Sequence, residues 1–473
     1  MKTKKRYIAL SLGMITLVGI TGCRFVDGGG EGGGDKIRLS IGFWPQSSDR
    51  TDVAMYNEWK DAFEEANPEY EIVGDPYTYS KETIGPKHNT HTLPMVYQTW
   101  FTEPETLKNS GYIRDITNIL NEFGWADKMD DEMRETLTFD NKIYGIPRDG
   151  YGLGLLINTK ILGDCGLLPE KNGKYVLYND DGSPAYPTTF EEVYEASQVI
   201  CDMTESKGMF VCTSNKNGGW QFSNMAWNYG AELEVKENGK WKANLDCDAA
   251  VEALTWLQKM KQEDLVYKGI AIAYDDWPSC IGERVGMAIV GSDILHLAKT
   301  TGYVDMNNLA FVPMPTGDGT HHYSLYGGTP FVFDEGTSDE QVRGILKFFD
   351  FIGRSPSTSE TNIAAIKKGY EVAQNKNQPI LPKIMPWKNQ DYLTVAKNLE
   401  KQYVSVDMDY YSPFFDTIGE YKKSEEPIAA QKMYEILDDS IQALFQNASS
   451  TNPKSLLTTA NSRLQKILDE LSA

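Results

Sequence analysis

The chain has 473 residues, more than one hydrophobic core usually covers, so two domains are expected. Its 67 Asp and Glu residues outnumber the 46 Lys and Arg residues and give a formal net charge of −21 at pH 7. This acidic balance argues against nucleic acid or anionic lipid as the ligand, because both bind to patches of Lys and Arg.

The first 23 residues have the pattern of a secretory signal. Basic residues over 1–6 precede an uncharged apolar run over 7–20, which is too short and wrongly flanked for a stable membrane span. The run closes with small residues directly before Cys23 and resembles a bacterial lipobox. That resemblance implies cleavage before Cys23 and a diacylglycerol thioether on its sulfur. Residues 1–22 are therefore expected to be a lipoprotein signal peptide.

A linker over 23–35 is expected to follow this signal. Its glycine-rich part, Asp27–Gly34, has few side chains to bury and should be a flexible leash. No later stretch approaches the apolar length that a membrane span needs. We therefore expect a lipid-anchored protein on the extracellular face of a bacterial cell membrane.

Strand and helix signals alternate along the rest of the chain. Alternating apolar residues predict a strand at 37–43, and Asp52 is expected to cap a helix that buries Trp59. Apolar runs predict further strands at 71–73, 153–158 and 285–290. Helix starts, marked by capping boxes or by proline in the first turn, are predicted at Thr189, Thr337, Pro427 and Pro453. The alternation indicates parallel sheets flanked by helices, with ligands bound on loops at the carboxyl ends of strands.

No motif for catalysis, a cofactor or a metal is found. The sequence lacks a Walker motif, a GxGxxG after a strand and a GxSxG elbow. Prolines around His88 and His91 exclude a helical zinc pair. The five cysteines after Cys23 show no metal spacing, and an odd number cannot all pair. Buried thiols are favoured, and a disulfide between Cys201 and Cys212 stays open.

Six segments share sequence patterns with one protein family. In chain order they are Leu107–Thr117, Asn141–Pro147, Leu155–Lys160, Pro187–Glu192, Gly286–Ser292 and the late pair Pro313–Pro315 with Gly327–Phe333. Together they resemble family 1 extracellular solute-binding proteins of ABC importers, the class that includes maltose-binding protein.

The resemblance implies an α/β fold of two lobes, similar to periplasmic binding proteins. Each lobe is expected to be a mainly parallel sheet flanked by helices, and a hinge of crossing strands should join the lobes. The expected crossings lie near 147–152, 291–296 and 352–358. This division assigns 36–148 and 294–354 to an N-terminal lobe, and 149–293 and 355–473 to a C-terminal lobe. Ligand would bind in the cleft between them.

Aromatic and polar side chains occur together on the loops that should face this cleft. Trp and Tyr rings stack on the C–H face of a sugar, while Asp, Asn, Gln and Arg bind its hydroxyls. Core packing is the alternative for every ring, and ligand contact is favoured most where rings end strands beside polar residues. The candidate ligand-binding residues are Trp44, Gln46, Trp100, Asp149, Tyr151, Trp220, Asn224, Trp227, Asp293, Tyr326, Gly328 and Tyr411.

The resemblance implies a monomeric carbohydrate-binding subunit without catalytic activity, which captures an oligosaccharide and delivers it to the permease of an ABC importer. A peptide or polyamine receptor of the same fold is the first alternative and would show carboxylates caging an amine. A surface glycoside hydrolase is the second, and it requires two carboxylates facing each other across the ligand.

Overall fold

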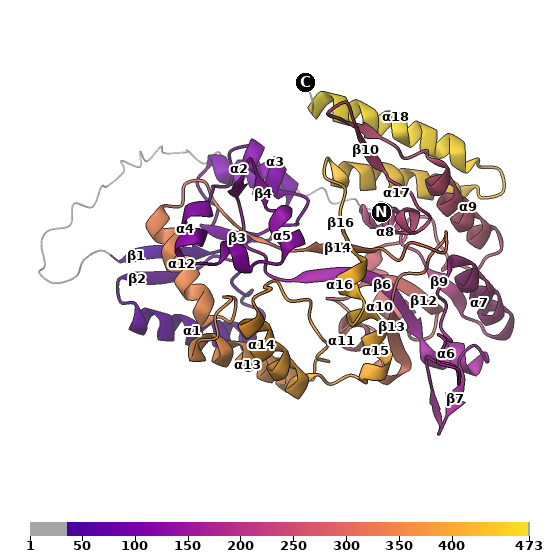
Figure 1. Ribbon diagram of the computed structural model, residues 1–473, viewed down its shortest axis with the longest axis horizontal. Coiled ribbons are helices and arrows are strands. Elements are labelled where there is room, and N and C mark those ends of the chain that lie inside the picture. The colour runs from indigo at the N-terminus through magenta and orange to yellow at the C-terminus, as the bar shows by residue number, and fades with distance from the viewer. Residues whose placement is uncertain (1–35, 472–473) are drawn as a thin grey trace, which may run out of the picture.

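Two sheets, each flanked by helices, organise residues 36–471, the part of the chain that the computed structural model describes (Figure 1). The predicted α/β architecture of two lobes is confirmed. The predicted signal peptide at 1–22 and the linker at 23–35, with Cys23, lie outside the described residues.

The smaller lobe is built on a four-stranded sheet. Strand β1 (Ile37–Ile41) pairs in parallel with β2 (Tyr70–Gly74) and β3 (Val96–Gln98), and β15 (Phe331–Phe333) pairs antiparallel to β3. The surrounding elements are α1 (Arg50–Ala66), α2 (Lys81–Asn89), α3 (Pro104–Asn109), α4 (Thr117–Glu122), η1 (Ala126–Lys128), α5 (Asp131–Glu135), β4 (Thr138–Phe139), β5 (Lys142–Ile143), α12 (Asp339–Phe351), α13 (Glu360–Asn375) and α14 (Gln390–Tyr403).

The larger lobe is built around β6 (Gly150–Asn158), a strand with almost every residue buried. One edge of β6 pairs with β12 (Val285–Gly291), and the other pairs with β13 (Leu309–Val312) and β14 (Ser324–Gly328), always antiparallel. The sheet is therefore mixed. Strands β9 (Lys207–Phe210) and β16 (Lys422–Ser424) complete it by parallel pairing with β12 and β14.

Helices and small hairpins surround this second sheet. They are α6 (Thr159–Asp164), β7 (Glu170–Lys171), β8 (Lys174–Tyr175), α7 (Phe190–Met203), α8 (Asn217–Asn228), β10 (Glu234–Glu237), β11 (Lys240–Ala243), α9 (Asp248–Gln262), η2 (Tyr274–Asp276), α10 (Trp277–Cys280), α11 (Leu297–Thr300), η3 (Met306–Asn308), α15 (Met408–Phe415), α16 (Ile418–Tyr421), α17 (Ala430–Gln446) and α18 (Pro453–Leu471).

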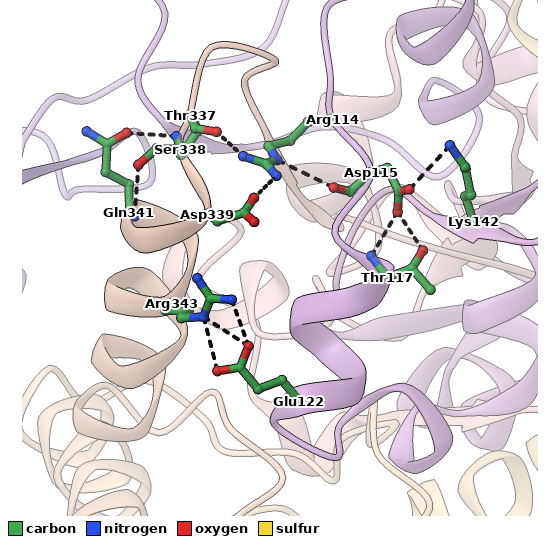
Figure 2. Close-up of polar contacts among 10 residues, drawn as sticks. All are labelled: Arg114, Asp115, Thr117, Glu122, Lys142, Thr337, Ser338, Asp339, Gln341 and Arg343. Carbon is green, nitrogen blue, oxygen red and sulfur yellow. Dashed lines mark hydrogen bonds and ion pairs between the residues drawn. The ribbon is translucent and has the colours of Figure 1, made fainter.

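The segment Leu107–Thr117, which contributed to the family resemblance, is joined to α12 through Arg114 and to Lys142 through Asp115 (Figure 2). The Asp115 carboxylate accepts hydrogen bonds from the backbone and hydroxyl of Thr117 at the start of α4. The Arg114 guanidinium donates to the Thr337 carbonyl and pairs with Asp339 at the start of α12. Arg114 and Asp115 thus stabilise the starts of α12 and α4, so their role is structural.

The helix starts predicted from local sequence patterns agree with the structure to within a few residues. The capping box at Thr189 is confirmed. The second box lies one residue later than predicted, at Ser338 with Gln341. Helix α1 is capped by Asp49, whose carboxylate accepts from the Asp52 backbone at 3.2 Å, so Asp52 lies inside the first turn instead.

The lobe boundaries differ from the predicted division in two places. The segment 294–330 belongs to the larger lobe, because β13 and β14 pair with β6. Helices α13 and α14 lie with the smaller lobe, where α13 contacts α1 and α12. The chain therefore crosses between lobes near 146–150, at 328–331 and after α14, and the crossings expected at 291–296 and 352–358 are wrong. An apolar run indicates a buried strand but does not say which sheet it joins.

A pair of glycines lies where two crossing strands meet. Gly150 at the start of β6 pairs with Gly328 at the end of β14. A Cβ at Gly328 would lie 2.4 Å from the Asp149 carbonyl and from the Phe101 ring, and one at Gly150 would lie 2.4 Å from Met133. The crossing therefore requires glycine at position 328, where a backbone carbonyl blocks any Cβ, whereas a Cβ at position 150 would displace the side chains of Met133 and Tyr326.

One charged contact joins the lobes beside this crossing. Lys422 of β16 lies 2.9 Å from Asp130 and 2.6 Å from Glu132, which are at the start of α5. Burial of Asp130 and Lys422, each with a side chain less than one-fifth exposed, strengthens their attraction.

The structure describes the cysteines and the helices of residues 36–471. The five cysteines of this part are unpaired, so Cys201 and Cys212 do not form a disulfide. None of the helices there is long and apolar enough to cross a membrane.

Candidate ligand cleft

A cavity of about 530 Å³ lies between the two lobes beside the glycine crossing. Trp100, at the end of β3, lines it from the smaller lobe, and β6, β12, α8 and α17 contribute residues from the larger lobe. Its lining residues are Trp100, Tyr151, Asn215, Lys216, Asn217, Trp220, Tyr274, Gly291, Asp293, Ile294, Gly328, Thr329, Glu425, Gln431 and Tyr434.

Aromatic rings around the cavity are held by contacts with one another. Trp220 packs edge-to-face against Tyr151, with ring centroids 5.9 Å apart, and against Tyr274 at 5.4 Å. On the smaller lobe, Trp100 packs edge-to-face against Tyr79 at 5.2 Å and is still 40 % exposed. Edge-to-face contacts fix ring orientation before ligand arrives, which reduces the entropy that ordering would cost on binding.

The position of Trp220 depends on close packing between α8 and α17. A Cβ on Gly219 would lie 2.2 Å from the Tyr434 carbonyl, so only glycine permits this approach. The Asp438 carboxylate of α17 accepts hydrogen bonds from the backbone nitrogens of Lys216 and Gly219 at the start of α8. This contact closes the helix end and brings Trp220 and Tyr434 to the same cavity.

Two carboxyl groups line the cavity among the aromatic rings. Desolvation by the surrounding protein, together with the nearby charge of Asp149, raises the pKa of Asp293 to about 7, although the side chain is still exposed to the cleft. Burial likewise raises the pKa of Glu425 to about 7, although its hydrogen bond from the Tyr434 hydroxyl, at 2.9 Å, opposes the shift. Near neutral pH each carboxyl is present partly as the neutral acid, so each can donate or accept a hydrogen bond.

Five predicted site residues line this cavity, and a sixth lies at its edge. The five are Trp100, Tyr151, Trp220, Asp293 and Gly328. Asp149 lines an adjoining cavity that shares Asp293, where it accepts a hydrogen bond from Thr329 at 3.0 Å and pairs with Arg148. Trp100 and Asp293 lie on loops that follow β3 and β12, whereas Tyr151, Trp220 and Gly328 lie within β6, α8 and β14.

Two predicted contacts on α8 are buried in the larger lobe and are wrong. Asn224 is fully buried; its amide donates to the Tyr323 carbonyl and accepts from the Leu325 backbone, which anchors β14. Trp227 is also fully buried, and its indole nitrogen donates to Glu426 at 2.9 Å. Both residues lie on a helix that is enclosed on nearly all sides.

Two predicted tyrosines are also interior residues and do not line the cleft cavity. Tyr411 is fully buried, with its hydroxyl 3.3 Å from the Met306 carbonyl. Tyr326 is buried with Phe101 and Met133 in a small cluster between the lobes. Both support packing, and neither is available to a ligand in this structure.

Trp44 and Gln46, at the end of β1, are absent from the residues that line the cavity. Trp44 packs edge-to-face against Tyr56 of α1, with centroids 5.2 Å apart, and lies against the core of the smaller lobe. The Gln46 carbonyl accepts from the Asp49 backbone in the turn that starts α1. Position at a strand end is not sufficient when the next helix folds over the ring.

Sequence reasoning missed several residues that line the cavity. Glu425, Gln431 and Tyr434 come from a segment more than 130 residues after Asp293, and nothing local marks them as cleft residues. Tyr274 precedes a short helix and its hydroxyl accepts from the Gly291 backbone at 2.9 Å. Only the tertiary arrangement brings these residues together.

No family model and no curated protein matches the sequence. Solved structures do match. The cyclic α-maltosyl-1,6-maltose binding protein from Arthrobacter globiformis aligns with a TM-score of 0.66 and 14% identity, over 92% of this chain and 100% of that one. An ABC substrate-binding protein from Listeria monocytogenes in complex with cycloalternan gives 0.67 and 12%, over 92% and 100%.

A third similar structure holds a different ligand. UgpB from Mycobacterium tuberculosis, in complex with glycerophosphocholine, aligns with a TM-score of 0.66 and 16% identity, over 93% of this chain and 100% of that one. The chain has the fold of ABC solute-binding proteins. Identities this low establish the fold and leave the ligand to the chemistry of the cleft.

The raised pKa of Asp293 predicts a pH-dependent stability. An unfolded Asp has a pKa near 3.8 and the folded one about 7, so folding is opposed progressively as pH rises from about 4 to about 7. Solvent screens part of this effect, because the Asp293 side chain is exposed to the cleft. The stability advantage of Asp293→Asn over the parent should therefore be larger at pH 8 than at pH 5, by about 1 kcal/mol. Exposed Asp275→Asn is the control. A stability difference between Asp293→Asn and the parent that does not change with pH would contradict this account.

Proposed function

We propose that this protein is the ligand-capturing subunit of an ABC importer and that it binds an oligosaccharide in the cleft between its lobes. The observation that supports this most directly is the composition of the cavity, with aromatic rings from both lobes and polar groups between them. A sugar presents C–H faces that stack on rings and hydroxyls that need hydrogen bonds. A cavity of about 530 Å³ has the volume of a small-molecule site, and an oligosaccharide would extend from it along the cleft.

The similar structures support the same ligand class. One is named for binding cyclic α-maltosyl-1,6-maltose and another was solved with cycloalternan. Binding proteins of this fold deliver ligand to a membrane permease, and we propose the same partner here. We propose no catalytic role for the cleft carboxyls.

Ligand capture is proposed to proceed by lobe closure about the glycine crossing. Trp100 belongs to one lobe, whereas Tyr151 and Trp220 belong to the other. A ligand that contacts all three rings gains its full binding energy only when the lobes are close together, so it shifts the population toward the closed arrangement.

A cationic ligand, such as a polyamine or peptide amine, is the second candidate. The two carboxyls, Asp293 and Glu425, lie among aromatic rings, and such rings attract cations. Binding of an amine would require both carboxyls to ionise, so affinity would rise steeply between pH 5 and pH 8. Affinity for a neutral sugar should not follow that rise.

We also propose that Cys23 is lipidated and anchors the protein to the outer face of the cell membrane. The supporting observation is the lipobox-like end of the signal sequence. Mass spectrometry of protein extracted from membranes should find lipid-modified Cys23 at the amino terminus. Detection of Met1, or of cleavage beyond Cys23, would refute the anchor.

Trp100→Ala tests the ligand and the site together. Calorimetry should first identify an oligosaccharide that binds the parent protein. Loss of the stacking ring should then weaken binding about tenfold or more, which corresponds to 1–3 kcal/mol, with little effect on melting because Trp100 is 40 % exposed.

Trp241→Ala is the matched control, because this partly exposed ring lies on the β10–β11 hairpin and is absent from the cavity lining. The Trp241→Ala variant should bind the oligosaccharide with the same affinity as the parent. If no oligosaccharide binds, the proposed ligand class is wrong; if Trp100→Ala binds like the parent, the site assignment is wrong.

A further inference from the structure

A second cavity, of about 290 Å³, meets the ligand cleft at Asp293. Asp149 and Asp293 line it from the hinge side, and residues of α13, α14 and the loop between these helices line it from the smaller lobe. The two cavities therefore occupy neighbouring parts of the same interlobe region.

Three cationic side chains line this second cavity: Arg148, Arg354 and Lys383. Among the described residues, the Arg354 guanidinium has no ion pair and no side-chain hydrogen bond. The Lys383 ammonium likewise has no carboxylate partner and lies over the Tyr370 ring, 4.6 Å from its centroid. Arg148 pairs with Asp149, yet its Nε is buried without a hydrogen-bond partner.

The carboxyls nearby compensate this positive charge only in part. Asp149 forms an ion pair with Arg148. Desolvation by the surrounding protein raises the pKa of Asp293 to about 7, so Asp293 is only partly ionised near neutral pH. Glu400 accepts a hydrogen bond from the Lys383 backbone at 2.9 Å, and burial raises its pKa to about 7 as well. Desolvation by the surrounding protein and the nearby Arg354 charge lower the pKa of Lys383 to about 8, although the residue is exposed and the charges of Glu400 and Asp149 oppose the shift.

Such a concentration of cations is unusual in a chain with a formal net charge of −21. Arg354 is half-buried, and a half-buried cation without a partner costs folding free energy unless a counter-charge completes the site. Lys383 is exposed to solvent, so its ammonium is accessible to a ligand. Both line a cavity beside the cleft, which indicates that the counter-charge comes with the ligand.

We propose that this cavity is an anion subsite and that the ligand carries an acidic group, a carboxylate or a phosphate, on a polyhydroxyl body that occupies the cleft. Arg354 and Lys383 bind the acidic group, and Arg148, which pairs with Asp149, lines the cavity beside them. The inference rests on the proposed function and narrows it from oligosaccharides in general to acidic ones.

Paired ligands test the subsite. Calorimetry on the full chain compares xylotetraose, the same backbone bearing a glucuronic acid branch, the same backbone bearing a phosphate ester, and inorganic phosphate alone. The parent should bind one of the two acidic sugars about tenfold or more tightly than the neutral sugar, because a charge-assisted contact is roughly worth that factor. The acidic sugar that the parent binds more tightly shows whether the subsite prefers a carboxylate or a phosphate.

Lys383→Met and Arg354→Gln should each reduce the preference for the acidic sugar toward parity and leave affinity for the neutral sugar unchanged. Lys383→Arg keeps the positive charge and should therefore keep the preference for the acidic sugar. Lys388→Met is the control, since Lys388 pairs with exposed Asp131 and is absent from both cavity linings.

The outcomes separate the two proposals. Equal binding of neutral and acidic sugars by the parent, or equal losses for both in Lys383→Met and Arg354→Gln, overturns the subsite and leaves the proposed function intact. Binding of inorganic phosphate that Lys383→Met abolishes, with no binding of any sugar, supports the subsite and overturns the carbohydrate ligand.

Discussion

The close approach of β6 and β14 at Gly150 and Gly328 is the constraint on which the arrangement of this protein depends. The two backbones meet where a Cβ on either residue would overlap its neighbours. Because the chain changes lobe within a few residues of this pair, the crossing sets how the lobes face each other. It also places Asp149 and Tyr151 on either side of Gly150, where they face the interlobe cavities. A site between lobes is thus a direct consequence of how the backbone passes between sheets.

The two cavities differ in the charge of the side chains that line them. The cleft has aromatic rings with two carboxyls that desolvation keeps partly protonated, which suits hydroxyls and tolerates a neutral ligand. The adjoining cavity contains Arg354 and Lys383 without carboxylate partners. Asp293 lies at the boundary between them, so its protonation links the two. An elongated ligand with one acidic end would match this division of charge.

The sequence predicted the parts of the fold that depend on local chemistry. The capping box at Thr189 and the buried strand of β6 follow from side chains within a few residues, and both are confirmed. The prediction that placed β13 in the N-terminal lobe is wrong, because its apolar residues would fit either sheet and β13 pairs with β6 of the larger lobe. In the cleft, Trp100 and Tyr151 were found by their position after strands or at their starts, whereas Tyr434 was not, since it lies on a helix that only tertiary packing brings to the cavity.

Solution scattering with and without ligand tests the central claim, that the lobes close about the glycine crossing, most directly. The radius of gyration should fall when the parent is saturated with an oligosaccharide that calorimetry shows to bind, because contacts to both lobes favour the closed arrangement. An unchanged radius of gyration at saturation would show that the lobes are fixed and would contradict capture by closure.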